Sequence, residues 1–271
     1  MIIPAYNEEK DLPLALSSLM KQNRNDFELI VIDDGSTDHT RQVIRDRFPK
    51  VILLEQDHQG PGAARNLGAH QAKGKILVFT DADIILEHDT LSKLVGPIEA
   101  GQHKATGWFN EKVYDPENTW SRCWQIAHRL PLDSRMPLGY DVTQARVFRA
   151  VRKDFFWELG GFKTNLGIHD DNLSPEPVPM LKEVTVYHKN PRGFVEVWQT
   201  AAWIGKGTVA SGGKDNGYKK LLTYALPKSI VVGLWRSIQF TLPQFLLFKI
   251  YFDLAVTVGI LKALLGQKVS K

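Results

Sequence analysis

The stretch that decides the fold is Ile76-Leu77-Val78-Phe79-Thr80-Asp81-Ala82-Asp83. Its first four residues are aliphatic or aromatic, which is typical of a strand buried on both faces of a parallel sheet. Side chains alternate along an extended chain, so Asp81 and Asp83 are expected on the same side. Ligands of open α/β sheets bind at the carboxyl ends of the strands, and two acids there can hold a hard divalent cation. The alternative is that Asp-Ala-Asp is only a solvated strand end.

The residues around this stretch alternate between strand-like and helix-like patterns. Strands are expected over residues 1–5, 27–32, 51–54 and 75–80, and helices over residues 11–19, 38–48 and 62–72. This order predicts an α/β fold with a doubly wound, mostly parallel sheet flanked by helices. Past Asp83 the pattern is less regular. It predicts helices over 91–100, 119–130, 152–159 and 194–204, and strands over 104–113, 142–151 and 184–188.

The composition is that of a packed globular chain, because 43% of the 271 residues are hydrophobic and 24% are charged. A net charge of +4 suits anionic substrates, a membrane surface or nucleic acid. The basic residues do not form a run with interleaved aromatics, which argues against nucleic acid as a partner. The single cysteine, Cys123, cannot form an internal disulfide and favours a reducing compartment. The first residues, Met1-Ile2-Ile3-Pro4, do not resemble a signal peptide.

The composition changes near Ser211-Gly212-Gly213, which predicts a domain over residues 1–212 and a helical tail over residues 213–271. From Asn216 onward there is one acid, Asp253, against eight basic residues. Residues 245–265 approach the ~20 apolar residues that span a bilayer, but they contain Asp253 and two lysines, which are costly in hydrocarbon. The tail is therefore expected to lie in, or dip into, a membrane interface. The alternative is an ordinary helical subdomain or a dimer face.

Four short motifs resemble those of one enzyme family. They are Ile2-Ile3-Pro4-Ala5-Tyr6-Asn7-Glu8-Glu9, Val31-Ile32-Asp33-Asp34-Gly35-Ser36-Thr37-Asp38, Gly62-Ala63-Ala64-Arg65-Asn66-Leu67-Gly68 and Asp81-Ala82-Asp83. In this order and spacing they resemble glycosyltransferase family 2, over roughly residues 1–205. The resemblance implies a GT-A fold, Rossmann-like in its sheet, and inverting transfer from a nucleoside-diphosphate sugar (UDP or GDP) with divalent Mg²⁺ or Mn²⁺. Taken together with the tail and the single cysteine, it predicts a lipid-linked or cell-surface glycan acceptor and a setting at the cytoplasmic face of the cell membrane.

Residues at the expected strand ends have a chemical reason to bind a nucleotide. The ring of Tyr6 could stack on a nucleobase, and Asp34 could accept a hydrogen bond from a base N–H. Their simpler alternatives are a surface tyrosine and a helix-capping aspartate. The resemblance assigns nucleotide-sugar binding to Pro4, Ala5, Tyr6, Asp33, Asp34, Arg65 and Asp81. It also implies metal binding by Asp83 together with Asp81, whereas Arg65 could equally be a solvated helix residue.

The acceptor side is expected in the second half of the sequence. Gly161, in Glu158-Leu159-Gly160-Gly161-Phe162, resembles part of an acceptor-side turn and also suits a helix C-cap. By resemblance, Asp170 in His169-Asp170-Asp171-Asn172-Leu173 is the general base, and Asp171 is its nearest competitor. Gln199 and Trp203 match the outer positions of a Gln-x-x-Arg-Trp pattern that has alanine in place of arginine here, so processivity is not supported. His188 is expected to be a structural histidine.

Two other functions are consistent with parts of the sequence. Gly60-Pro61-Gly62-Ala63-Ala64-Arg65 imitates a dinucleotide-binding Gly-x-Gly-x-x-Gly, but arginine occupies the sixth position and the motif follows the third strand. A glycosyltransferase-like module could also bind a sugar nucleotide or a membrane partner without turnover. Its support is the proline-rich Ser174–Pro179, which stands where the family has a helix.

Overall fold

The computed structural model describes residues 1–137, 143–164 and 174–266, and these form two compact units. The first contains a sheet with flanking helices and comprises the described parts of Met1–Tyr114, Ser134–Thr164 and Asp171–Lys189. The second is helical and comprises Asp115–Asp133 and the described part of Asn190–Lys271.

The first unit begins with a parallel sheet, as the sequence predicts. Its strands are β1 (Ile2–Ala5), β2 (Ile30–Asp33), β3 (Ile52–Glu55) and β4 (Ile76–Val78). β1 pairs in parallel with β2, and β2 pairs in parallel with β3. A parallel bridge between Ile2 and Phe79 joins β1 to the chain just after β4. The carboxyl ends of β1, β2 and β4 therefore lie at one edge of the sheet.

The remaining strands make the sheet mixed. They are β5 (Ile84–Leu86), β6 (Ala105–Val113), β7 (Gln144–Ala145), β8 (Ala150–Arg152) and β9 (Val178–His188). β8 lies antiparallel between β4 and β6, and β9 runs parallel to β6. β5 and β7 pair antiparallel with β9. Because β9 reaches β5, its last residue, His188, lies opposite Ile84, one residue after Asp83.

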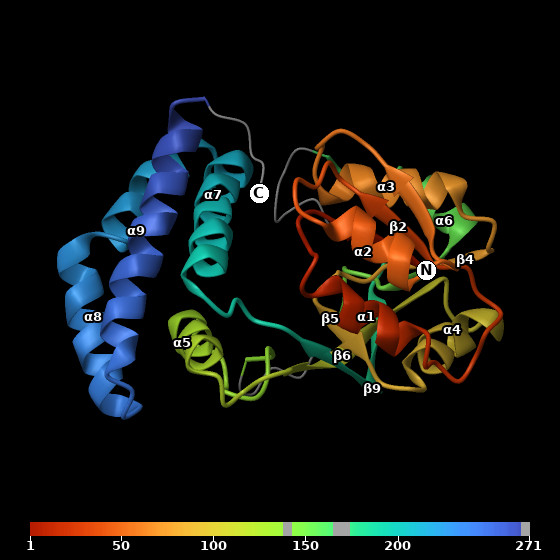
Figure 1. The fold of residues 1–271 in the computed structure, drawn as a ribbon, viewed down its shortest axis with the longest axis horizontal. Helices are drawn as coiled ribbons and strands as arrows, with labels where there is room; N and C mark the ends of the chain where they lie inside the picture. The colour runs from red at the N-terminus through yellow and green to blue at the C-terminus, as the bar shows by residue number, and fades with distance from the viewer. Residues whose placement is uncertain (138–142, 165–173, 267–271) are drawn as a thin grey trace. The chain divides into compact units, whose positions relative to one another are not determined.

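Helices cover both faces of this sheet, which confirms the predicted α/β fold class. They are α1 (Leu12–Leu19), α2 (Thr40–Arg47), α3 (Pro61–Gln71), α4 (Thr90–Glu99) and α6 (Lys153–Glu158). α1 and α4 lie on one side of the sheet, and α3 and α6 lie on the other (Figure 1). Successive strand residues divide between the two faces, as alternation requires: Ile3 packs in the core with α1, and Ile2 packs in the core with α3. Gly68 allows this close approach of α3, since a Cβ there would lie 2.6 Å from Ile2.

The sequence patterns missed some boundaries. The three-residue β5 was not expected, because it follows Asp83 directly and is too short to show a period. The strand expected over 142–151 is wrong in extent: within the described residues only β7 and β8 form, and Arg146–Arg149 between them is irregular. β9 and the helix beginning at Phe194 are both longer than expected.

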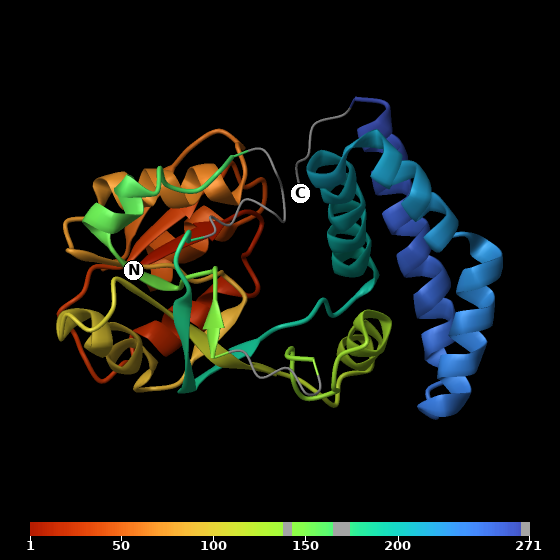
Figure 2. The same cartoon turned by 180° about the vertical axis from the view of Figure 1, so that it is seen from behind.

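The second unit is built from α5 (Thr119–His128), α7 (Phe194–Thr223), α8 (Leu226–Gln239) and α9 (Gln244–Leu264). α9 packs against both α7 and α8 and lies between them (Figures 1 and 2). Aromatic side chains of α5 and α9 fill its core, with Trp124 edge-on to Phe252 at 5.6 Å. The backbones of α7 and α9 come into direct contact at Gly259 of α9. A Cβ at this position would lie 2.0 Å from the Ala202 carbonyl oxygen of α7.

The tail predicted over residues 213–271 is helical as far as it is described, to residue 266. Gly213, at φ 73°, interrupts α7 at the point where the composition changes. The compact helical unit nevertheless begins before this position, because it includes α5 and all of α7. A functional boundary at 212/213 stays a prediction. Among the described residues, α9 is one helix whose length and apolarity would let it cross a membrane, and 44% of its most apolar window is buried within the protein.

Candidate active site

Side chains that follow β1, β2 and β4 form the candidate site. Tyr6 follows β1, Asp34 follows β2, and Asp81 lies three residues beyond β4. Since these strands run parallel, the three side chains leave the same edge of the sheet. Pro4 and Ala5, also expected at the site, are the last residues of β1 and lie against the last residues of β2.

Asp34 organises the loop that follows β3. Its buried carboxylate accepts hydrogen bonds from the Gln56 side chain at 2.6 Å and from the backbone N–H groups of Gln59 and Gly60, each at 2.9 Å. The His58 ring nitrogen Nδ1 lies 2.9 Å from the same carboxylate. A carboxylate has about four acceptor positions, so this loop already engages most of them. Asp34 is therefore not a helix cap, the simpler alternative for this residue.

Tyr6 and His58 form a stacked aromatic pair. Their ring centroids are 4.1 Å apart and their planes are inclined by 29°. Gly35 allows the backbone at His58 to come this close. Gly35 has a φ of +79°, and a Cβ on it would lie 2.9 Å from the backbone nitrogen of His58. Tyr6 is thus a half-buried ring held by a neighbour, and His58 is a site residue that the sequence patterns did not indicate.

Three buried polar atoms, one in the last residue of β2 and two in residues that follow β3 and β4, lack a hydrogen-bond partner among the described residues. They are Oδ2 of Asp33, Nε2 of His58 and Oγ1 of Thr80. Asp33 is fully buried, and its other oxygen accepts a hydrogen bond from the Ser36 N–H at 3.0 Å. Most buried polar groups in folded proteins are bonded, so three unbonded ones along one edge of the sheet point to a place for a polar ligand or water.

Arg65 is buried against Asp81. Its Nη2 lies 2.6 Å from Oδ1 of Asp81, and its guanidinium lies 5.3 Å from the centre of the Phe162 ring. Arg149 approaches the other Asp81 oxygen at 3.4 Å. Burial raises the pKa of the Asp81 carboxyl, but the two guanidinium groups outweigh burial and the net pKa is lowered. Arg65 is 7% exposed, which excludes the alternative of a solvated helix residue.

Asn66, the neighbour of Arg65, ties α3 to the Gly160-Gly161-Phe162 turn. Its Nδ2 donates to the Phe162 carbonyl, and its Oδ1 accepts from the Phe162 N–H, both at 2.9 Å. Gly161 has φ +71°, and a Cβ there would lie 2.9 Å from Oδ1 of Asn66. The motif containing Arg65 and the turn expected on the acceptor side are therefore one connected structure.

Asp83 belongs to a chain of charged side chains. Its Oδ2 lies 3.1 Å from Nε2 of His188, whose Nδ1 lies 2.6 Å from Glu111. Arg135 contacts the same Glu111 oxygen at 2.9 Å. Burial lowers the pKa of His188, but the carboxylates of Asp83 and Glu111 outweigh burial and raise it from 6.5 to about 9. Both ring nitrogens of His188 have a carboxylate partner, as expected of a structural histidine. One of these partners, Asp83, is the expected metal ligand.

The carboxylates at the site suit one way of binding a divalent cation, in which the substrate supplies some of the ligands. The described residues contain no group of three or more His, Cys, Asp or Glu side chains arranged around one point, so an all-protein cage is not formed. Asp83 offers a partly exposed carboxylate, with 33% of the side chain accessible. Mg²⁺ is commonly held by one or two carboxylates together with substrate phosphates, and this arrangement matches that mode.

The positions of four predicted site residues relative to this edge stay predictions. Asp170 and Asp171 lie outside the described residues. Gln199 and Trp203 lie on α7 of the second unit, where Gln199 is exposed and Trp203 is half-buried. Their acceptor-side role stays a prediction.

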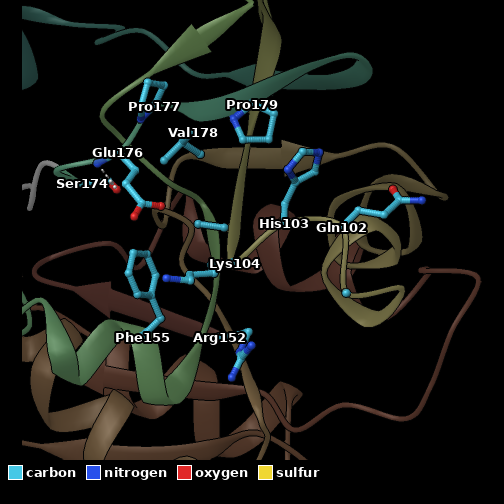
Figure 3. A pocket seen from close by; sticks show the side chains of 12 residues that line it. Gln102, His103, Lys104, Arg152, Phe155, Ser174, Glu176, Pro177, Val178 and Pro179 are labelled. Atoms are coloured by element: carbon cyan, nitrogen blue, oxygen red, sulfur yellow. Dashed lines mark hydrogen bonds between the residues drawn. The ribbon is translucent and has the colours of Figure 1, made fainter.

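A separate pocket of about 380 Å³ lies elsewhere in the first unit (Figure 3). It is lined at the start of β6 and the end of β8, where Arg152 pairs with Ile76, the first residue of β4. This is the sheet edge opposite to the carboxylates. Lys104 stands over the Phe155 ring at 4.6 Å there. The position separates this pocket from the candidate active site.

Comparison with known proteins identifies the family. The profile of glycosyl transferase family 2 matches residues 1–160, which is more than half of the chain. The protein belongs to this family of glycosyltransferases, as the four motifs predict. The match and the position of the glycine motif after β3 both argue against a dinucleotide-binding dehydrogenase.

Curated relatives match parts of the chain. A poly(ribitol-phosphate) β-N-acetylglucosaminyltransferase, TarS, of Staphylococcus aureus is 40% identical over 97 residues, covering 34% of this chain and 17% of that protein. The glycosyltransferase AglE of Haloferax volcanii is 29% identical over 177 residues, covering 61% of this chain and 56% of that protein. The chain thus spans less than two thirds of the length of these relatives.

Solved structures show the fold. Residues 1–349 of Staphylococcus aureus TarS, in complex with UDP-GlcNAc, align with a TM-score of 0.51 at 18% identity, covering 98% of this chain and 91% of that chain. The mannosyltransferase PcManGT of Pyrobaculum calidifontis, in complex with GDP-Man and Mn²⁺, aligns with a TM-score of 0.53 at 17% identity, covering 98% of this chain and 87% of that chain. The expected GT-A fold is confirmed.

Proposed function

We propose that this protein is an inverting glycosyltransferase that moves a sugar from a nucleoside-diphosphate sugar to a lipid-linked or cell-surface glycan acceptor. One observation carries the proposal: the unbonded buried atoms of Asp33, His58 and Thr80 lie at the carboxyl edge of the sheet, where α/β folds bind ligands. Membership of glycosyltransferase family 2 supports it.

The nucleotide occupies the end of this edge formed after β1 and β2. Tyr6 and His58 offer aromatic faces, and every nucleobase has a face that can stack on such rings. Asp34 acts chiefly by holding the loop from Gln56 to Gly60, because that loop takes most of its acceptor positions. The candidate donors are UDP-GlcNAc and GDP-Man, the sugar nucleotides bound by the two solved relatives.

The diphosphate lies toward Asp81 and Asp83. Arg65 keeps a positive charge buried beside Asp81 and so lowers the cost of placing an anion there. Asp83, with Asp81 as its neighbour, would hold the divalent cation, Mg²⁺ or Mn²⁺. When bound, this ion neutralises the charge that develops on the leaving diphosphate.

Transfer with inversion is a single displacement. The acceptor hydroxyl oxygen forms a bond to the anomeric carbon as the bond from that carbon to the phosphate oxygen breaks, and the electron pair leaves with the nucleoside diphosphate. The hydroxyl proton passes to a carboxylate on the opposite side. In this proposal, which follows the family resemblance, Asp170 has this role with Asp171 as the competitor, and the Gly161 turn, Gln199 and Trp203 serve the acceptor.

The setting of the reaction is the cytoplasmic face of the cell membrane. The apolar length of α9 and the basic excess after Asn216 support contact with a membrane surface. The single cysteine, Cys123, is buried as a free thiol, which agrees with a reducing compartment.

Release of nucleoside diphosphate tests the proposal. With UDP-GlcNAc or GDP-Man and Mn²⁺, the protein should release UDP or GDP slowly without acceptor and faster with a suitable one. Asp170→Asn should keep donor affinity and lose transfer by ~10²-fold or more, the scale of a general base. Asp171→Asn should be milder, and the reverse order would move the base to Asp171. Donor binding without any release would instead support the non-catalytic module.

A further inference from the structure

The outer face of α8 is apolar along the length of the helix. Its exposed side chains there are Leu226, Ile230, Val231, Leu234, Trp235 and Ile238. Residues of a helix turn by about 100° each, so these six cover roughly half of its circumference. The opposite face is buried: a Cβ at Gly233 would lie 2.8 Å from Leu246 of α9. Single exposed apolar residues are ordinary, but a contiguous face of this kind marks a contact surface.

A pocket of about 220 Å³ borders this face within the same unit. Its lining includes the basic residues Arg129, Lys228, Arg236 and Lys249 and the aromatic rings of Tyr224 and Trp235. Trp235 belongs to both the pocket and the apolar face, and the Arg236 guanidinium lies over its ring at 4.7 Å. The pocket and the apolar face therefore meet along one side of α8.

The pocket has an uncompensated positive charge. Its acid, Asp253, is buried and is neutralised by Lys249, whose Nζ lies 2.6 Å from both carboxylate oxygens. Ser229 donates a further hydrogen bond to Asp253 at 2.6 Å. Among the residues that the structure describes, Arg129, Lys228 and Arg236 form no ion pair with a carboxylate. Three cations thus face a small cavity beside an apolar surface.

We propose that α8 lies in the interface of an anionic membrane, with its apolar face in the acyl boundary and the phosphate of a lipid headgroup in this pocket. A lipid surface has an apolar layer directly next to anionic groups, which is the same juxtaposition that α8 presents. A second copy of the chain would cover the apolar face but would leave the three cations unexplained. The inference deepens the membrane contact included in the proposed function, and it assigns that contact to α8 rather than to the longer α9.

Vesicle flotation of the full chain tests this assignment. The protein should float with vesicles of phosphatidylglycerol and phosphatidylcholine and should bind pure phosphatidylcholine far more weakly. Val231→Glu should abolish flotation because it places a charge in the apolar face. Val195→Glu is the matched control, since Val195 on α7 is 69% exposed and Val231 is 67% exposed; this variant should float as the parent does.

A second pair of variants tests the pocket. Lys228→Gln with Arg236→Gln should weaken binding to the anionic vesicles by roughly thirtyfold, since each basic residue near such a surface contributes about fivefold. Lys219→Gln, at an exposed lysine outside the pocket, should have a much smaller effect. Calorimetric donor binding by each variant keeps this result separate from the proposed function.

Three results would overturn the inference. The parent protein could fail to float with anionic vesicles, Val231→Glu could float unchanged, or the pocket variants could bind no more weakly than Lys219→Gln. A concentration-dependent dimer that Val231→Glu abolishes in sedimentation, with no flotation of the parent, would identify the face as a contact between two copies. A parent protein that floats as predicted but binds neither donor would refute the proposed function and leave this assignment intact.

Discussion

Replacing Asn66 with alanine should loosen the turn at Gly161 and Phe162. The substitution removes two hydrogen bonds of 2.9 Å, each contributing about 1 kcal/mol to stability. For the bond from the Phe162 N–H, in a residue that is 6% exposed, the loss is about 1–3 kcal/mol instead, because a buried donor is left without a partner. We therefore expect the free energy of unfolding of the sheet unit to fall by about 2–4 kcal/mol.

Urea unfolding and hydrogen exchange measure this change. The midpoint for unfolding should fall, and the Phe162 amide should exchange faster by roughly 30-fold to 1,000-fold if opening of the turn controls exchange. Gln71→Ala, on an exposed residue of the same helix, should stay within about 0.5 kcal/mol of the parent. An Asn66→Ala protein that matches this control in both measurements would refute the argument that Asn66 holds the turn.

Two further predictions concern packing and protonation. Gly259→Ala should destabilise the helical unit by about 1–3 kcal/mol, because the new Cβ meets the Ala202 carbonyl at 2.0 Å and backbone cannot yield as a side chain can; unchanged thermal unfolding of the helical unit would show that α7 and α9 do not pack this closely. His188 should titrate near pH 9 by NMR in the absence of divalent cations. Because this pKa is raised above its ordinary value of 6.5, the stabilisation by Asp83 and Glu111 is complete below pH 6.5 and is lost as the pH rises through about 9. Saturating Mg²⁺ should lower the measured pKa by competing for Asp83, and a pKa of 6.5 without the ion would contradict the contact.

The sequence predicts the parallel half of the fold well, for physical reasons. The strands up to Phe79 are continuous apolar runs and the helices between them are amphipathic, so each element has a local signal. The same signal places Tyr6, Asp34 and Asp81 at strand ends, and a parallel sheet brings strand ends together. The short antiparallel β5 and β7 carry too few residues to show a period.

Other parts of the site depend on contacts between distant segments. His58 is a single histidine in a loop, and only the folding of that loop around Asp34 brings it to Tyr6. Arg149 lies in an irregular segment and reaches Asp81 because β8 returns beside β4. Glu111 reaches His188 because β6 and β9 run side by side. No pattern along the sequence encodes these pairings. Asn66 does lie in one of the four family motifs, but its hydrogen-bond partner, Phe162, is almost a hundred residues away in the sequence.

The most direct test of the central claim is calorimetric titration of the full chain with UDP-GlcNAc and GDP-Man, with and without Mn²⁺. The claim is that the carboxyl edge of the sheet binds a nucleoside-diphosphate sugar with a cation at Asp83. We predict Mn²⁺-dependent binding of one of these donors by the parent protein and by Asp89→Asn, a surface carboxylate on the same unit that pairs with Lys93. We predict loss of that binding in Asp83→Asn under conditions where circular dichroism shows the variant to be folded, because the variant also loses its contact with His188. Equal Mn²⁺-dependent affinity in Asp83→Asn, or no binding of either donor by the parent protein, would contradict the account.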